Sequence, residues 1–167
     1  MPRPHDNAQG NVTRRDFVRY STLSASALAV ANMPALARQN SSTSRPINVG
    51  LIGCGGRGTG AAHNALEAHE DVHIVAMTDA FPDRLNNSRK SIREHGSGRG
   101  KVKDASCYTG FDAYTKLLKD DVDVVILATP PHFRPIHFEA AVDAGKHVFM
   151  EKPAAVDPSG IRQVIRA

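Results

Sequence analysis

Two patterns of apolar and polar positions follow each other repeatedly along residues 46–167, one typical of strands and the other of helices. Apolar runs that predict strands occupy 47–52, 72–78, 122–129 and 147–150, and 106–109 is expected to be a further short strand. The run at 122–129 has the continuous apolar character of a strand buried on both faces of a parallel sheet. Segments with apolar side chains at helical spacing follow them at 59–69, 82–94, 111–119, 133–144 and 157–167. This alternation predicts an α/β fold, a doubly wound parallel sheet of the Rossmann type with five strands.

One single glycine and one glycine-rich segment mark breaks in this pattern. Gly145 is expected to end the helix over 133–144, because glycine adopts the left-handed conformation that closes many helices. Residues 95–104 carry Gly, Lys and Arg and predict a polar, mobile loop.

The first apolar run leads directly into a Gly-x-Gly-x-x-Gly motif. Its first glycine permits a tight turn, the second lets the backbone approach a pyrophosphate, and the third lets helix and strand pack closely. The following helix then directs its free N–H groups at the phosphates. A strand before and a helix after the motif make it a dinucleotide-binding fingerprint. We therefore expect cofactor contacts from Gly53, Cys54, Gly55, Gly56, Arg57 and Gly58. For Arg57, a position over the pyrophosphate and a merely solvated side chain both remain open.

Asp79 ends the second apolar run, 21 positions after Gly58. An acid about 20 residues beyond the motif accepts hydrogen bonds from the adenosine ribose hydroxyls and repels a 2′-phosphate. The sequence therefore predicts NAD as the cofactor, with NADP less favoured. Arg84 argues in the other direction, because a nearby arginine can accommodate that phosphate. The alternative for Asp79 is an N-cap of the helix over 82–94.

The N-terminal residues have the three parts of an export signal. Arg14 and Arg15, followed by Phe17, resemble a twin-arginine motif, a mildly apolar stretch covers 21–31, and small residues lead to Ala37. The stretch is too short and too rich in Ser and Ala for a stable membrane anchor. We expect residues 1–37 to be a cleaved signal to the periplasm, 38–45 a polar linker and 46–167 an NAD-binding domain. A basic amphipathic surface helix is the alternative for the leader.

The twin-arginine route bears on the cofactor. Its export machinery, an expected partner, moves folded proteins, and free nicotinamide cofactor is not expected outside the cytoplasm. We therefore expect the protein to fold on its NAD before export and to keep it tightly bound.

Composition limits the remaining options. A length of 167 residues with 41% hydrophobic content suits one modest domain plus an extension. The net charge is +4, but residues 1–37 contain four arginines against two aspartates, so the basic balance gives no argument for nucleic acid. Cys54 and Cys107 indicate neither a metal site nor a disulfide framework.

Three segments at the carboxyl ends of predicted strands resemble the glucose–fructose oxidoreductase/inositol dehydrogenase (Gfo/Idh/MocA) family. They are Gly-Leu-Ile-Gly-Cys-Gly-Gly-Arg-Gly at 50–58, Ala-Thr-Pro-Pro-His at 128–132 and Gly-Lys-His-Val-Phe-Met-Glu-Lys-Pro at 145–153. The resemblance covers about residues 46–167, the family's nucleotide-binding half. Ligands of such sheets bind outside the strand ends, where these segments converge.

The resemblance implies roles for residues on the two later segments. Thr129, Pro130 and His132 would lie along the nicotinamide end of the cofactor, and Glu151 and Lys152 would also contact it. Lys152 would reach both substrate and nicotinamide ribose, where its ammonium group stabilises developing negative charge. The alternative is a solvent-exposed Lys152 paired with Glu151.

The histidines are less distinctive. His132, our second catalytic candidate, either bonds substrate or cofactor or caps the helix that starts at Phe133. His137 and His147 are expected to be structural.

The family's second, substrate-binding domain is missing from this chain, and we expect the sequence to be truncated at Ala167. The leading interpretation is the cofactor-binding part of an exported NAD-dependent oxidoreductase that acts on CH–OH groups of a sugar or polyol and is inactive without the other half. A glycosidase of the same family, with transient oxidation and no net redox change, is the alternative. A dinucleotide-binding remnant without catalysis is a further one. The resemblance also implies a homo-oligomer held through the missing domain.

Overall fold

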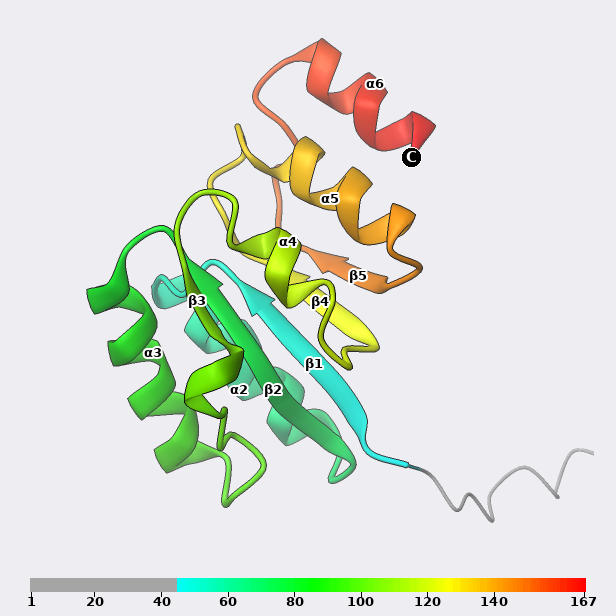
Figure 1. The fold of residues 1–167 in the computed structure, drawn as a ribbon. Coiled ribbons are helices and arrows are strands. Elements are labelled where there is room, and N and C mark those ends of the chain that lie inside the picture. The colour runs from blue at the N-terminus through cyan, green and yellow to red at the C-terminus, as the bar shows by residue number, and fades with distance from the viewer. Residues whose placement is uncertain (1–44) are drawn as a thin grey trace, which may run out of the picture. The chain divides into compact units, whose positions relative to one another are not determined.

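The computed structural model describes residues 45–167, so the predicted export signal and nearly all of the linker lie outside the described residues. A five-stranded, all-parallel sheet with strand order β3-β2-β1-β4-β5 forms the centre of this domain (Figure 1). The strands are β1 Ile47–Ile52, β2 Val72–Asp79, β3 Cys107–Thr109, β4 Val124–Leu127 and β5 His147–Met150. The predicted doubly wound Rossmann-type sheet is confirmed, and β1 is the strand from which the order runs outward in both directions.

Helices cover both faces of the sheet, with α2 and α3 on one face and α4 and α5 on the other (Figure 1). The helices are α2 Gly56–Ala68, α3 Pro82–His95, α4 Tyr114–Leu117, α5 Arg134–Asp143 and α6 Pro158–Arg166, with a 3₁₀ turn at Asp104–Ser106. Helix α6 packs on α5, and the side chain of Asp157 caps it by accepting a hydrogen bond from Gly160 N.

Two hydrophobic cores result, one on each face of the sheet. Successive strand residues point to opposite faces, so Leu51 packs under α2 and α3 while Ile52 packs with Leu117 and Leu127. All four are nearly or completely inaccessible to solvent. Burying a side chain of this size stabilises the fold by about 1.5–3 kcal/mol, so these cores hold the strand ends in place.

Several element boundaries differ from the sequence prediction. Helix α2 begins at Gly56, three residues earlier than predicted, because Gly55 is extended and its carbonyl accepts the first helical hydrogen bond from Thr59 N. Glycine has a low helix propensity, so the pattern of side chains delays the predicted start. Helix α4 is a single turn, and β4 and β3 are shorter than predicted. Gly145 does end α5: it follows the C-cap Ala144 and has a φ of +68°.

The segment 95–104, predicted to be a mobile polar loop, is joined to the end of α2 and to β2 by hydrogen bonds. Arg99 Nη1 donates hydrogen bonds to the carbonyls of Leu66 and His69, at 2.7 and 2.9 Å, and Arg99 O accepts one from Ile74 N. Gly100 is buried where a Cβ atom would lie 2.4 Å from Ile92 O. The amino-acid composition of the segment does not reveal these hydrogen bonds, because their acceptors are backbone carbonyl oxygens.

Within residues 45–167, no helix is long and apolar enough to cross a membrane. The same residues contain no group of three or more His, Cys, Asp or Glu side chains placed to hold a metal ion.

Candidate functional site

The glycine loop after β1 has the geometry that its three glycines predict. Gly53 has a φ of +98°, and a Cβ atom there would lie 2.8 Å from the backbone of Thr129. A Cβ at Gly58 would lie 1.9 Å from Gly53 O, so only glycine lets α2 pack this closely on the turn. At Gly55 and Gly56 nothing lies within 4 Å of the Cβ position. That side of the loop is open to a ligand.

Asp79 ties this loop to the end of β2. One carboxylate oxygen accepts a hydrogen bond of 2.7 Å from Cys54 N, and the other accepts one of 2.9 Å from Phe81 N. The N-cap of α3 is Phe81, with no side-chain capping bond, so the alternative of Asp79 as N-cap is wrong. A carboxylate has about four acceptor positions, so each oxygen keeps capacity for a further donor.

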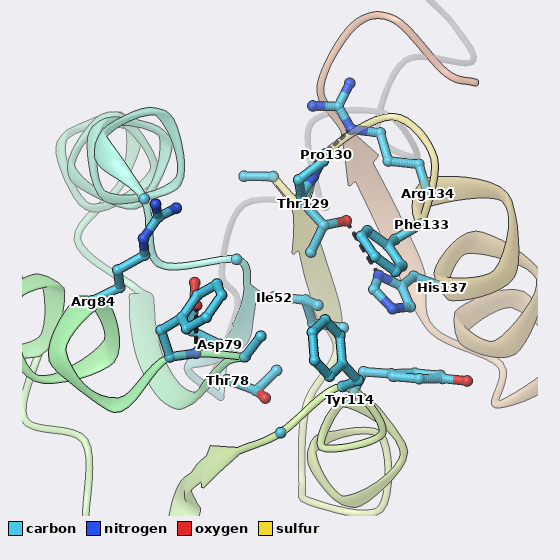
Figure 2. A pocket seen from close by; sticks show the side chains of 17 residues that line it. Ile52, Thr78, Asp79, Arg84, Tyr114, Thr129, Pro130, Phe133, Arg134 and His137 are labelled. Carbon is cyan, nitrogen blue, oxygen red and sulfur yellow. Dashed lines mark hydrogen bonds between the residues drawn. The ribbon is translucent and has the colours of Figure 1, made fainter. Parts of the chain in front are cut away.

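A cavity of about 270 Å³ opens beside Asp79, at the point where the strand order reverses between β1 and β4 (Figure 2). On one side lie Asp79, Phe81 and Arg84, with the Arg84 guanidinium 5.3 Å from the centre of the Phe81 ring. An aromatic wall of Tyr114, Phe133 and His137 faces them across the cavity. Phe111, which also lines the cavity, lies against Phe133 with ring centroids 6.0 Å apart. In open α/β sheets this is the place where nucleotides bind.

His137 belongs to that wall and is buried, in agreement with its predicted structural role. Its Nδ1 lies 3.2 Å from the hydroxyl of Thr129 (Figure 2). Burial lowers the pKa of His137 to about 4, so the ring is neutral at physiological pH. The contact fixes the side chain of Thr129 at the cavity edge.

Arg57 and Glu151 meet on the other face of the sheet. Arg57 Nη2 lies 2.8 Å from Glu151 Oε1, and both residues line a second cavity along α2 and β5. The predicted alternative of a Glu151–Lys152 pair is wrong. Lys152 is exposed, and its ammonium makes no hydrogen bond or ion pair within residues 45–167.

His132 is exposed and packs edge-on against Phe133, with ring centroids 5.2 Å apart. Phe133 is the N-cap of α5 and no side chain caps that helix, so the alternative of His132 as a helix cap is wrong. Neither His132 nor Lys152 lines the cavity in Figure 2, whereas Gly53, Gly55, Asp79, Thr129 and Pro130 do.

Arg134 is the residue that the sequence prediction missed. It is 6% exposed, and its guanidinium donates hydrogen bonds to three backbone carbonyls: those of Thr129 at 2.7 Å, Glu151 at 2.6 Å and Pro153 at 2.5 Å. A signal was present, since Arg134, His137 and Ala141 share one helical face and the last is fully buried.

These features fit a dinucleotide. The N-cap Gly55 offers no side-chain acceptor to the first turn of α2, which has no acidic residue either, so its N–H groups remain available for a pyrophosphate. The open space at Gly55 admits that group, and the fixed carboxylate of Asp79 can accept from ribose hydroxyls.

Residues 47–167 match the family model described as "Oxidoreductase family, NAD-binding Rossmann fold". The chain belongs to the Gfo/Idh/MocA family. The resemblance predicted from three sequence segments is thus confirmed, and so is the prediction of NAD as the cofactor of this domain.

Two named relatives are glycosyl hydrolases. The chain is 34% identical, over 85% of its length, to "Glycosyl hydrolase family 109 protein 2" of Shewanella sp. (strain ANA-3), of which it covers 34%. It is 35% identical, over 71% of its length, to "Glycosyl hydrolase family 109 protein 1" of Bacteroides thetaiotaomicron, of which it covers 25%. The chain therefore spans about a third or less of these curated relatives.

Similar solved structures include dehydrogenases and a reductase. Scyllo-inositol dehydrogenase from Lactobacillus casei with bound NAD(H) and scyllo-inositol is 26% identical with a TM-score of 0.56, over 72% of this chain and 32% of that one. A 3-ketoreductase from Actinomadura kijaniata in complex with NADP is 28% identical with a TM-score of 0.53, over 72% of this chain and 34% of that one.

Proposed function

We propose that this chain is the cofactor-binding part of an exported NAD-dependent oxidoreductase that transfers hydride to or from a sugar or polyol. The observation that carries the proposal is the carboxylate of Asp79, held by two N–H groups at the edge of the open glycine loop. A similar dehydrogenase that holds NAD(H) and scyllo-inositol supports a polyhydroxylated substrate. When bound, NAD accepts a hydride from a carbon that carries a hydroxyl, and NADH gives one to a carbonyl.

In this proposal Lys152 acts on the reacting oxygen. Its ammonium group is exposed and unpaired in the described part of the chain, so it is available to a substrate hydroxyl and to the nicotinamide ribose. A positive charge there stabilises the negative charge that develops as the hydroxyl loses its proton. His132, also exposed, is proposed as a second polar contact at the nicotinamide end, beyond Thr129 and Pro130.

The periplasm is the proposed location, reached through the twin-arginine machinery by way of residues 1–37. N-terminal sequencing of the exported protein tests this, with a start after Ala37 expected and a start at Met1 contradicting it. Tight retention of NAD is tested by gel filtration of the purified protein, which would remove a loosely held cofactor.

A glycosidase is the second candidate, favoured by the names of two relatives at 34 and 35% identity. In that reaction the sugar is oxidised transiently and the cofactor is restored, so no net redox change results. Product analysis separates the candidates, because a hydrolysed glycoside without net NADH formation selects the glycosidase. A remnant without catalysis would bind NAD and transfer no hydride.

Replacement of Asp79 by Asn tests the cofactor assignment. The amide keeps the size of the side chain and one acceptor oxygen but loses the charge that repels a 2′-phosphate. We expect affinity for NAD to fall about tenfold while affinity for NADP is unchanged or higher, measured by calorimetry. Asp83→Asn, an exposed acid in the first turn of α3, is the matched control. Equal affinities of the Asp79→Asn variant and the wild type for NAD would contradict the ribose assignment.

A test of catalysis begins with the extent of the reading frame. The nucleotide sequence beyond the codon for Ala167 comes first: a continuing frame with a further α/β domain supports the enzyme, and a stop codon supports the remnant.

A further inference from the structure

Arg134 joins two loops that the sheet does not hold together. The last paired residues of β4 and β5 are Leu127 and Met150, and one more backbone bond, Glu151 N to Leu127 O at 3.0 Å, continues the ladder. Beyond it, the chain after β4 turns toward α5 and the chain after β5 runs toward α6 (Figure 1). Beyond this bond no strand pairing connects the loop after β4 with the loop after β5, so side-chain contacts determine how the two loops lie.

The guanidinium of Arg134 occupies this junction. Its Nε donates to Thr129 O in the first loop, and its Nη1 donates to Glu151 O and Pro153 O in the second. The two carbonyls in the second loop flank Lys152. A planar guanidinium has donors that point in several fixed directions, so one side chain can serve both loops, whereas a lysine ammonium binds as a single point.

Burial makes this arrangement demanding. Desolvation lowers the pKa of Arg134, an effect that the nearby charge of Glu151 opposes. The carboxylate of Glu151 is engaged by Arg57, and Arg134 bonds to the backbone carbonyl of Glu151. A buried cation whose hydrogen-bonded partners are backbone carbonyls is stable only while those carbonyls stay in place, so the contact resists displacement of either loop.

The ammonium group of Lys152 makes no hydrogen bond or ion pair within residues 45–167. Its ammonium is therefore placed by the backbone on either side of it, which is the part that Arg134 holds. We propose that Arg134 is a positioning residue for Lys152, which it fixes against the Thr129 loop at the cofactor edge. This role rests on the proposed function, in which Lys152 contacts the nicotinamide ribose and substrate.

Hydrogen exchange of the 167-residue chain, resolved by peptide, tests the clamp without any ligand. In Arg134→Lys we expect amides in residues 150–156 and 128–133 to exchange about tenfold faster than in the wild type, with residues 47–58 unchanged. Arg99→Lys is the matched control, because Arg99 also bonds three backbone carbonyls, those of Leu66, His69 and Val72. That variant should loosen its own neighbourhood and leave 150–156 unchanged.

The outcomes are distinct. Unchanged exchange in 150–156, or an equal increase throughout the chain, would overturn the proposal, the second because it indicates a general packing role. Arg134→Met serves as a second variant, and its melting temperature shows whether it folds. Arg134→Lys keeps the charge, so a local increase in that variant cannot be ascribed to loss of the cation.

NADH affinity provides the functional readout in a double-mutant cycle with Lys152→Met. We expect Arg134→Lys to weaken NADH binding about tenfold in the wild-type background and to have no further effect in the Lys152→Met background. If the two substitutions lowered NADH affinity independently, so that their factors multiplied in the double variant, the result would contradict an action of Arg134 through Lys152. Failure of the wild-type chain to bind NADH, or no effect of Lys152→Met, would count against the proposed function, and hydrogen exchange would still decide whether Arg134 fixes the loop.

Discussion

The guanidinium of Arg57, in the first turn of α2, lies 2.8 Å from the buried carboxylate of Glu151 at the end of β5. The two groups form an ion pair without a well-aligned hydrogen bond to Glu151 Oε1. The Arg57 side chain is 70% exposed and that of Glu151 5%, and both residues line the second cavity.

Removal of Arg57 should therefore destabilise the domain through Glu151. Arg57→Ala leaves a buried carboxylate without its cation, and we expect the melting temperature to fall by about 5 °C. Adding Glu151→Gln in the same protein should restore most of that loss, because the remaining side chain is then neutral. Thermal unfolding followed by circular dichroism measures both. Arg57→Ala with a wild-type melting temperature would show that solvent already screens the carboxylate.

The glycine loop allows stability and cofactor binding to be separated. Gly58→Ala would place a Cβ atom 1.9 Å from Gly53 O, and we expect a loss of about 3 kcal/mol or more of stability. Gly55→Ala meets nothing within 4 Å and suits the extended backbone there, so stability should change by less than about 1 kcal/mol. Its methyl group would occupy the approach of the pyrophosphate and weaken NADH binding at least about tenfold.

Urea unfolding and calorimetric NADH titration of the two variants check this. Gly60→Ala, within α2 and also open within 4 Å, controls for the loss of a glycine outside the predicted cofactor contacts. If Gly55→Ala bound NADH as the wild type does, the pyrophosphate would not approach at Gly55.

The features of this domain that the sequence predicts correctly are those that show as a periodic pattern of side chains or as a fixed distance between motifs. Apolar runs locate four of the five strands, and the distance from Gly58 to Asp79 identifies the acid that borders the cavity. Such features are local, since each depends on residues that follow one another along the chain.

Contacts between side chains and distant carbonyls could not be predicted in the same way. Arg134 reaches Pro153 across 19 positions and Arg99 reaches Leu66 across 33, and in both cases the acceptor is a backbone oxygen that any residue could supply. The pairing of Glu151 with Arg57 could not be predicted either, because the two residues lie far apart along the chain. The adjacent Lys152 is not the partner, since neighbouring side chains on an extended chain point to opposite sides.

The two thiols should differ in reactivity. Cys54 is buried in the glycine loop, where desolvation and the charge of Asp79 raise the pKa of its thiol. Cys107 is only half-buried, and burial raises its thiol pKa as well. The thiolate is the reactive form, so we expect a neutral-pH alkylating agent to label Cys107 at least about tenfold faster than Cys54 in the native protein.

Peptide mass spectrometry of a time course measures the two rates. In Cys107→Ser, Cys54 should resist labelling until the protein is unfolded in guanidinium chloride. Rapid labelling of Cys54 in that native variant would mean that the glycine loop opens more readily than its contacts indicate.

His137 makes stability depend on pH in one window. The pKa of His137 is about 4 in the folded domain, against about 6.5 in an unfolded chain. Between these values the unfolded state binds a proton that the folded state does not, so stability falls as the pH drops from about 6.5 to about 4. Above the window both states are neutral at this site, and below it both are protonated. We expect a loss on the order of 3 kcal/mol across the window.

Urea unfolding at a series of pH values, for the wild type and for His137→Gln, measures this contribution. Carboxylates titrate in the same range, and burial beside His95 also lowers the pKa of His63, so only the difference between the two proteins reports on His137. As the pH falls, the free energy of unfolding of the wild type should decrease more than that of His137→Gln, because glutamine does not bind a proton in the unfolded state. Parallel curves would show that His137 becomes protonated in the folded domain without cost, and that the wall beside Thr129 admits water.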